Sequence, residues 1–487
     1  MQLNDVSLLK NQAYLNGVWV SESNNLQFEI TNPANGERIS SVPNMGEMET
    51  REVIQSAKEC WPAWRALLAK ERSTILRKWF DLIMQNQTDL AKILSWEQGK
   101  PLAEAMGEIA YGASFIEWFA EEAKRVYGDI IPNTLADRRL LVIKQPVGVV
   151  CTITPWNFPT AMITRKAAPA LAAGCPIIIK PAAETPLSAL ALAELGERAG
   201  FPAGVLNVIT SDKAVEVGGE MTSNPDVRKV SFTGSTRVGK LLMKQCADTV
   251  KKISLELGGN APFIVFDDAD IDAAVDGAMA SKYRNSGQTC VCANRLIVQD
   301  SVYDEFSTKL AEAVKGLNVG EASEENVTQG PLINEAAVHK VEKHINDAIK
   351  KGASIVTGGK RHEKGGTYFQ PTVLINVDNS MLVASEETFG PVAPIFKFST
   401  EQEALELAND TEFGLAAYFY ARDVGRIWRI AEGLEAGIVG INEGIISTEV
   451  APFGGVKESG LGREGSKYGI DEFLEMKYLC MGLGKNS

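Results

Sequence analysis

The sequence predicts an α/β protein built from more than one domain, and three observations support this fold class. The chain has 487 residues, which is too long for one ordinary domain. Hydrophobic residues make up 45% of it, enough to build substantial cores. From residue 176 onward, short apolar runs alternate with helical patterns, an order typical of parallel sheets covered by helices. We therefore expect two or three domains.

The first part of the chain is expected to be mainly helical. Residues 47–128 show the pattern of several helices, the last beginning after Pro101 and ending at Gly128. Proline at a helix start and glycine just beyond its end are the usual signals for these boundaries. A β-rich stretch follows at residues 139–154. We interpret the helices as packing material around a core.

The alternating region divides into two series, which predict two α/β units. The first has a helix at 187–200, further helices between its later strands, and strands at 176–180, 204–210, 229–234 and 252–257. The second has helices at 271–285, 302–317 and 336–351, and strands at 294–300, 416–421 and 437–442.

Composition narrows the range of partners and compartments. The net charge of −13 disfavours nucleic acid and anionic membranes, because both would be repelled by the average surface. The first residues lack the pattern of a signal peptide, and the apolar run ending at Lys180 is broken by glycine and proline before it could span a bilayer. Seven thinly spread cysteines disfavour a disulfide framework. We expect a cytoplasmic protein without nucleic-acid or membrane partners.

The three histidines offer little for catalysis or metal binding. His339, His344 and His362 lie away from every chemical motif, and their spacing does not form a HExxH pattern. We interpret them as surface helix positions. No metal site is expected, and catalysis has to proceed without imidazole.

Three other residue types together indicate chemistry on a carbonyl group. Cys290 lies in the short polar segment GQTCVC, directly after a helical pattern. Glu256 ends a strand-like run before a glycine turn, where it would be free to activate water, and Asn157 supplies an amide within PWNFP. A thiol, a carboxylate and an amide donor can attack a carbonyl, hydrolyse a thioester and stabilise an oxyanion. Each alone would more often be a buried thiol, a turn carboxylate or a capping amide.

Two glycine patterns suggest phosphate loops, and only one has the right context. Gly460, Gly462 and Gly465 fit GxGxxG, but too little chain follows for a βαβ unit, so we interpret them as a turn near a domain junction. Residues 234–240, GSTRVGK, follow a strand and resemble a Walker A loop, with Leu241 where a magnesium-binding Ser or Thr would stand. This context favours a dinucleotide pyrophosphate at a helix N-terminus.

Motifs along nearly the whole chain resemble those of the aldehyde dehydrogenase family. They are TNPANGE from Thr31, PWNFP, IIIKPAAETP, SFTGS, LELGGN, GQTC, EETFGP and PFGGVKESGLGREGSKYG. Longer matches, ITPWNFPTAMITRK, YRNSGQTCVCANR, NDTEFGLAAYFYARD and GIISTEVAPFGG, are similar to the succinate-semialdehyde and glutarate-semialdehyde members.

The resemblance implies the aldehyde dehydrogenase fold and its division into domains. Residues 1–126 and 145–257 would form a Rossmann-like dinucleotide-binding domain, and residues 258–458 an α/β catalytic domain. Residues 127–144 and 459–487 would form a small β oligomerisation arm with the C-terminal tail. Members of the family are usually dimers or tetramers, so a homodimer or homotetramer is expected.

The resemblance also implies a site for NAD or NADP. The matching positions are Pro155, Trp156, Lys180, Ala183, Gly234, Ser235, Leu257, Glu387 and Phe389. Lys180 ends an apolar strand, where a cation could meet a ribose hydroxyl or a 2′-phosphate. NAD-preferring members commonly carry glutamate three residues later, where this chain has Ala183, so we expect NADP to be accepted, and a preference for NADP over NAD stays open. Ser211 replaces a glycine that the family usually has in a nearby turn.

The expected substrate is a small acidic aldehyde. Arg165 and Arg284 are candidates to hold a distal carboxylate through paired hydrogen bonds. The resemblance implies the same role for both and adds Ser447. It implies oxidation of succinate semialdehyde to succinate, through a thiohemiacetal and a thioester on Cys290, in 4-aminobutyrate degradation.

Several alternatives stay open at this point. Glutarate semialdehyde from lysine or 5-aminovalerate degradation, or another aldehyde, could be the substrate. Glu256 disfavours a CoA-acylating dehydrogenase, and Leu241 disfavours a nucleoside triphosphatase. The complete set of three catalytic groups disfavours a silent binding protein. Cys292 could be inert, or it could form a reversible disulfide with Cys290.

Overall fold

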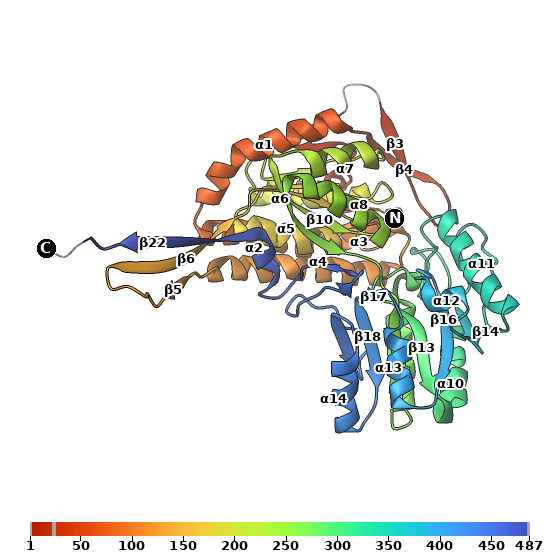
Figure 1. The fold of residues 1–487 in the computed structure, drawn as a ribbon. Helices are drawn as coiled ribbons and strands as arrows, with labels where there is room; N and C mark the ends of the chain where they lie inside the picture. Colours follow the sequence, from red (N-terminus) through yellow and green to blue (C-terminus); the bar gives the residue numbers. More distant parts are fainter. Residues whose placement is uncertain (1, 22–25, 485–487) are drawn as a thin grey trace.

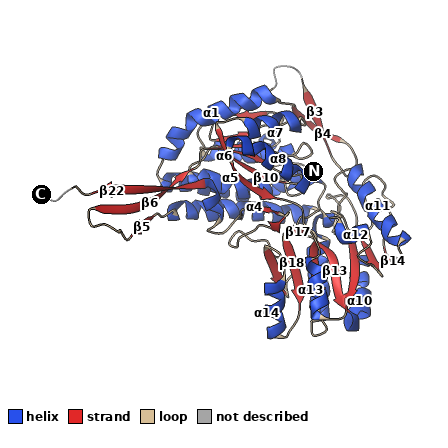
Figure 2. Cartoon of the chain, viewed as in Figure 1, coloured by secondary structure: helices blue, strands red, loops and turns tan. Residues whose placement is uncertain are grey.

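The computed structural model describes residues 2–21 and 26–484. It contains two large sheets, each flanked by helices, and a thin three-stranded sheet that projects from the body (Figures 1 and 2). The predicted α/β class is therefore confirmed. The two large sheets lie in different parts of the molecule. In Figure 1, the helix α4 (Leu102–Glu122) and the strand β17 (Phe413–Gly414) lie near the boundary between these two parts.

The first large sheet has eight strands in the order β2-β1-β9-β8-β7-β10-β11-β21. Its five central strands are parallel, and the strands at both edges are antiparallel. The strands are β1 (Ala13–Leu15), β2 (Val18–Val20), β7 (Val149–Ile153), β8 (Ile177–Lys180), β9 (Leu206–Val208), β10 (Val227–Thr233), β11 (Lys252–Glu256) and β21 (Gly460–Leu461).

Helices with strongly buried faces pack around this sheet. They include the helices predicted for residues 47–128, and Trp64, Trp79 and Phe119 from these helices lie in one core with the sheet. The helices are α1 (Glu47–Ala66), α2 (Ala69–Gln85), α3 (Gln87–Gln98), α4, α5 (Ala161–Ala173), α6 (Pro186–Ala199), α7 (Ala214–Ser223) and α8 (Thr236–Cys246).

The second large sheet has seven strands in the order β14-β15-β16-β13-β12-β18-β19. The strands are β12 (Ala261–Val265), β13 (Ala293–Gln299), β14 (Ser354–Thr357), β15 (Thr372–Ile375), β16 (Val392–Phe398), β18 (Ala416–Tyr420) and β19 (Ile438–Ile441). The helices around it are α9 (Ile271–Lys282), α10 (Tyr303–Lys315), α11 (Glu335–Lys350), α12 (Leu382–Ser385), α13 (Glu401–Asn409) and α14 (Val424–Gly433). Two short ladders complete the body, β3 (Gln27–Thr31) with β4 (Arg38–Pro43), and β17 with β20 (Val456–Lys457).

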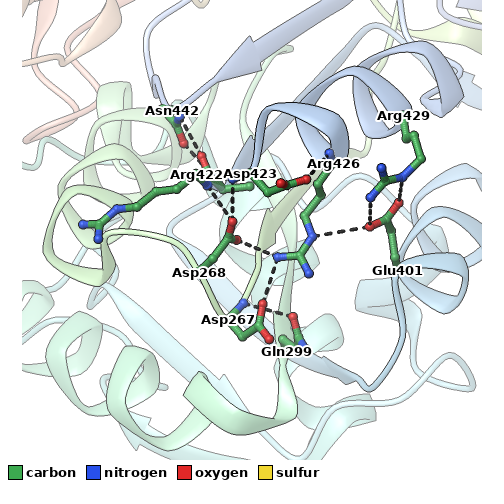
Figure 3. Close-up of polar contacts among 10 residues, drawn as sticks. Asp267, Asp268, Gln299, Glu401, Arg422, Asp423, Arg426, Arg429 and Asn442 are labelled. Carbon is green, nitrogen blue, oxygen red and sulfur yellow. Dashed lines mark hydrogen bonds and ion pairs between the residues drawn. The ribbon is translucent and has the colours of Figure 1, made fainter.

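A charged network fastens two helices of the second unit to the end of β12 (Figure 3). Arg426 of α14 pairs with Asp267 at 2.8 Å and Asp268 at 2.6 Å. Glu401 at the start of α13 accepts from Arg429, also of α14, at 2.6 Å. Because β12 and β13 are parallel, this network lies at the opposite end of the sheet from Cys290, which precedes β13.

The projecting sheet joins two distant segments of the chain. The strand β22 (Leu474–Gly482) pairs along nine residues with β6 (Arg138–Pro146), and β6 pairs with β5 (Asp129–Ile131). Figure 1 shows this sheet extending away from both large sheets, with the C-terminus at its far end. We call these three strands the arm.

Two predicted helix ends are wrong, for identifiable reasons. The helix expected to reach Gly128 ends at Glu122, and Gly128 instead lies against β6, where an added Cβ would come within 2.0 Å of the Val142 carbonyl oxygen. The helix expected to reach Asn285 ends at Lys282. Asn285 and Ser286 have φ values of 52° and 56°, which an α-helix does not allow.

The histidine interpretation is right for one residue and wrong for two. His339 occupies an exposed position on α11. His344 is fully buried, because it lies three residues after Val341 on the apolar face of the same helix. Its ring nitrogens lie 3.1 Å from Thr388 Oγ1 and 3.1 Å from Glu386 Oε2. His362 lies in a loop rather than a helix.

Candidate active site

A cavity of about 380 Å³ forms where the C-terminal ends of the first sheet's strands face the second unit. It brings together residues that are far apart in the sequence. Nine of the predicted site residues line it, namely Pro155, Trp156, Asn157, Gly234, Ser235, Leu257, Cys290, Glu387 and Phe389.

The turn between β10 and α8 has the geometry expected for a phosphate site. Ser235 caps α8 by accepting a hydrogen bond from the Val238 N–H. The Gly234 N–H donates to the Glu256 carbonyl oxygen at 3.1 Å, and an added Cβ on Gly234 would lie 2.4 Å from the Phe232 ring. Only glycine fits this position without displacing that ring. Gly234 and Ser235 line the cavity, so α8 begins at its edge, and a helix N-terminus favours an anion there.

The opposite side of the cavity is formed by the EETF segment. Glu387 accepts a hydrogen bond from the Gly259 N–H at 3.1 Å, and burial raises its pKa to about 7. Phe389 has a φ of 56°, and its ring meets the Trp156 ring edge to face at 5.6 Å. The two aromatic residues thus connect the first sheet's loop to the second unit beside the cavity.

Lys180 and Ala183 lie beside this cavity rather than in its lining. Lys180 ends β8 next to Ile153 of β7, which leads into the PWNFP segment. Its side chain is buried, burial lowers its pKa, and its Nζ donates to the Pro181 carbonyl oxygen at 3.3 Å. Ala183 lies in the following turn, and Glu184 is exposed. The atypical Ser211 is buried and donates to the Met45 carbonyl oxygen at 2.6 Å.

Cys290 lies between this cavity and a smaller one. The smaller cavity is lined by Cys290 and by all three predicted substrate residues, Arg165, Arg284 and Ser447. Burial raises the pKa of the Cys290 thiol to about 12, although the Arg165 guanidinium acts in the other direction. The thiol is therefore protonated at neutral pH in this arrangement.

The Asn157 side chain is held next to the cysteine segment. Its Nδ2 donates to the Gln288 carbonyl oxygen at 3.0 Å. The backbone carbonyl oxygen of Asn157 accepts from Lys100 Nζ at 2.8 Å and from Asn285 Nδ2 at 3.0 Å. Asn157 is buried, so these contacts are shielded from water and fix the loop in one position.

Glu256 ends β11 as predicted and is almost completely buried. It pairs with Gly460 of β21, and its Oε2 has no hydrogen-bond partner among the described residues. Burial raises its pKa well above the usual value, and the charge of Glu464 adds to the effect. Such a carboxyl group favours the neutral form until a proton acceptor or a change in surroundings removes its proton.

The two predicted arginines differ in their partners. Arg165 forms a buried ion pair with Glu464, which also pairs with Lys166. Burial alone would raise the pKa of Glu464, but these two cations outweigh it and the pKa is lowered. Arg284 lies 5.2 Å from the Phe158 ring centre and has no ion pair or hydrogen bond from its guanidinium among the described residues. Arg284 is thus the cation available to a ligand.

Cys292 lines neither cavity. It is fully buried, and its Sγ donates to the Lys282 carbonyl oxygen at 3.2 Å. Burial raises its pKa. Cys290 and Cys292 are both free thiols here, as are the other five cysteines.

Sequence reasoning missed several residues around the site. Glu464 lies inside the glycine pattern 460–465, and Lys166 lies inside the ITRK match, so both were visible but had no role assigned. Lys100, Glu108 and Tyr111 belong to segments interpreted as packing material. Within the described part of the chain, no group of three or more His, Cys, Asp or Glu side chains is arranged to hold a metal ion. No helix there is both long enough and apolar enough to cross a membrane.

Comparison with known proteins gives consistent matches over nearly the whole chain. The model of the "Aldehyde dehydrogenase family" matches residues 19–479. Succinate-semialdehyde dehydrogenase [NADP(+)] GabD of Escherichia coli is 65% identical, with 99% of this chain and 100% of that protein covered. Glutarate-semialdehyde dehydrogenase of Pseudomonas aeruginosa is 64% identical over the same shares. The crystal structure of an E. coli NADP-dependent enzyme superposes with a TM-score of 0.98 at 64% identity, covering 99% of this chain and 100% of that one.

Proposed function

Because the chain belongs to the aldehyde dehydrogenase family, we propose that it oxidises succinate semialdehyde to succinate with NADP or NAD. The observation that carries this proposal is the position of Cys290. Its thiol lies between a cavity lined by the glycine turn before α8 and a smaller cavity with an arginine that has no ion pair among the described residues. The glycine turn of the first cavity matches the chemistry of a dinucleotide, and the arginine of the second matches the distal negative charge of an acidic aldehyde.

The proposed chemistry begins with the thiolate of Cys290. It attacks the aldehyde carbon, and the resulting oxyanion accepts hydrogen bonds from the Asn157 amide and the Cys290 backbone N–H. A nicotinamide dinucleotide held along the cavity by Gly234, Ser235 and Glu387 would supply the hydride acceptor, and loss of hydride from the thiohemiacetal would leave a thioester on Cys290. Glu256, once it has lost its own proton, takes a proton from a water molecule that attacks the thioester. The carbon–sulfur bond then breaks, releasing the carboxylic acid and regenerating the thiol.

The same geometry requires a step that activates Cys290. With a pKa of about 12, its thiol has to lose a proton before it can attack. Glu256 is not the acceptor that we propose, because its buried carboxyl group favours the neutral form and its charge would raise the pKa of the thiol further. We propose that the proton passes to water in the cavity. The guanidinium of Arg165 stabilises the thiolate once it forms.

For the cofactor, we propose that NADP is accepted at least as well as NAD. Ala183 places no carboxylate three residues after Lys180, so nothing at that position would repel a 2′-phosphate. The name of the E. coli relative specifies NADP(+), which agrees with this proposal. A kcat/KM with NAD tenfold or more above that with NADP would contradict it.

The main alternative substrate is glutarate semialdehyde. The P. aeruginosa relative that bears this name is almost as similar as the succinate-semialdehyde enzyme. One methylene group separates the two aldehydes, and a site usually discriminates such a difference by only about 1–3 kcal/mol. The arginine-lined cavity accommodates the chemistry of both.

We also propose that the chain acts in the cytoplasm as a homodimer or homotetramer. Free thiols at all seven cysteines suit a reducing compartment. The projecting arm exposes apolar side chains, as expected of a surface that joins copies of the chain.

The experiment that tests the function follows the absorbance of reduced cofactor. The purified protein is offered succinate semialdehyde, glutarate semialdehyde and butanal, each with NADP and with NAD. We expect the acidic aldehydes to be preferred strongly over butanal. If butanal were used equally well, oxidation through Cys290 would still stand, but the assignment of an acidic semialdehyde as substrate would be wrong. No reduction with any aldehyde would favour a silent protein, and a requirement for CoA would favour an acylating enzyme.

A further inference from the structure

Tyr111 presents a hydroxyl group to the smaller cavity. It lies in the middle of α4 and lines this cavity together with Arg284, Ser447 and Cys290. Its oxygen is buried and makes no hydrogen bond of normal geometry among the described residues, although the Ser447 hydroxyl lies close enough to lower its pKa slightly against the effect of burial. A buried hydroxyl without a partner is unfavourable, so its presence beside a cavity indicates a ligand that completes it.

The ring of Tyr111 is held firmly by its surroundings. It meets the Phe115 ring edge to face, with centres 5.1 Å apart and an angle of 78° between the planes. Phe115 lies one helical turn along α4, and Phe158 and Met162 pack on another side of Tyr111. The direction of the hydroxyl group is therefore set before a substrate enters.

The charges around the cavity favour an anionic ligand. Glu464 already pairs with Arg165, whereas the Arg284 guanidinium has no such partner among the described residues. Burial raises the pKa of Tyr111, so its phenol stays protonated and remains a donor at neutral pH. A carboxylate has about four acceptor positions, enough for an arginine and two hydroxyl groups.

We propose that the Tyr111 hydroxyl donates a hydrogen bond to the distal carboxylate of the substrate, beside Arg284 and Ser447. This inference rests on the proposed function and adds a specificity-determining residue to it. In this role Tyr111 distinguishes acidic aldehydes from neutral ones of the same length. It does not contact the carbon at which Cys290 reacts, so it acts on binding rather than on the chemical step.

The variant Tyr111→Phe tests the proposal, because it removes one oxygen and keeps the ring. Steady-state kinetics with succinate semialdehyde and with butanal would be compared. We expect kcat/KM for succinate semialdehyde to fall about tenfold, mainly through KM, as is typical for losing a hydrogen bond to a charged group. The value for butanal should change less than about twofold, because butanal has no distal carboxylate.

The controls separate this inference from the proposed function. Tyr127→Phe removes an exposed hydroxyl outside both cavities and should alter neither substrate. Equal losses with both aldehydes, or no loss with either, would overturn the role of Tyr111 while leaving the enzyme a semialdehyde dehydrogenase. A wild-type protein without preference for acidic aldehydes would overturn both the function and this inference.

Discussion

At the level of single residues, the thiol of Cys290 is the group whose surroundings most affect reactivity. Because the pKa of this thiol is raised to about 12, its thiolate fraction is small at pH 7. As long as the pH stays below the pKa, each rise of one pH unit increases this fraction about tenfold. We expect the rate of Cys290 alkylation by iodoacetamide in the cofactor-free protein to rise in this way from pH 7 to pH 9. Peptide mass spectrometry measures it, with free cysteine in the same solution as a check on the reagent. A rate independent of pH would mean that the thiol is already ionised.

Glu256 gives a second prediction at this scale. Glu256→Gln keeps the size of the side chain but removes the group that we propose as proton acceptor for water, so hydrolysis of the thioester should slow about 10²–10⁴-fold. The protein should then release one equivalent of reduced cofactor rapidly and carry the acyl group as added mass. Cys290→Ala is the matched control, since it should bind cofactor but show neither the burst nor the added mass. Full turnover by the glutamine variant would remove Glu256 from the mechanism.

Arg284 and Arg165 should respond differently to truncation because their partners differ. Arg284→Ala removes a guanidinium without an ion pair, so kcat/KM for succinate semialdehyde should fall about 100-fold with little change in stability. Arg165→Ala would leave the buried Glu464 short of one cation, so the free energy of unfolding should fall by about 3 kcal/mol. Urea unfolding and kinetics with butanal as the neutral substrate measure both effects. Equal kinetic effects of Arg284→Ala on both aldehydes would contradict the carboxylate role.

At the level of elements, a buried ion pair connects α4 to the loop that carries Asn157. Lys100 Nζ donates to Glu108 Oε2 at 2.5 Å and to the Asn157 carbonyl oxygen at 2.8 Å. Glu108 Oε1 accepts from the Thr160 N–H at 2.9 Å, at the start of α5. The Lys100–Glu108 pair therefore holds the loop at Asn157 and at Thr160, although neither residue of the pair lines either cavity.

We expect Lys100→Met to lower the free energy of unfolding by about 3 kcal/mol, because Glu108 is left buried without its cation. It should also lower kcat about tenfold if Asn157 is the oxyanion donor that we propose, since displacing such a donor costs up to about 10²–10³-fold. In the double variant Lys100→Met/Glu108→Gln, stability should recover while kcat stays low. Thermal unfolding and saturating kinetics measure the two effects separately. Recovery of kcat together with stability would show that the pair serves the fold alone.

Much of the element pattern could be predicted, and the failures have local causes. Periodicity indicated the helices of residues 47–128 and the strands of both sheets, because these segments follow a regular apolar pattern. It could not show that Gly128 serves a close approach to β6, since that contact is with a later strand. It also missed the left-handed conformations of Asn285 and Ser286, which turn the chain toward Cys290. The surface position expected for His344 is wrong, because its hydrogen-bond partners, Thr388 and Glu386, lie in a distant segment that the helix pattern does not reveal.

At the level of the whole molecule, the site depends on contacts that no local pattern reveals. Glu464 reaches Lys166 across 298 residues because β21 adds to the edge of β11. Motifs predicted the thiol, the carboxylate and the amide, since each lies in a distinctive segment. They gave no information about the ion pair of Arg165 or the hydroxyl of Tyr111. Those features arise where α4, α5 and the C-terminal segment meet.

The arm gives the last prediction. Its outer strand β22 exposes Met476, Tyr478 and Met481, with 76%, 58% and 53% of each residue's surface accessible. A three-stranded sheet with such surfaces and an open edge is poorly stabilised alone and is suited to packing against another chain. We therefore expect Met476→Glu/Tyr478→Glu to lower the mass of the assembly, because burying two carboxylates would cost several kcal/mol at each interface. Sedimentation velocity measures this mass, and Ile349→Glu, on the exposed surface of α11, is the matched control that should leave it unchanged. A double variant with the wild-type mass would mean that the arm does not join the subunits.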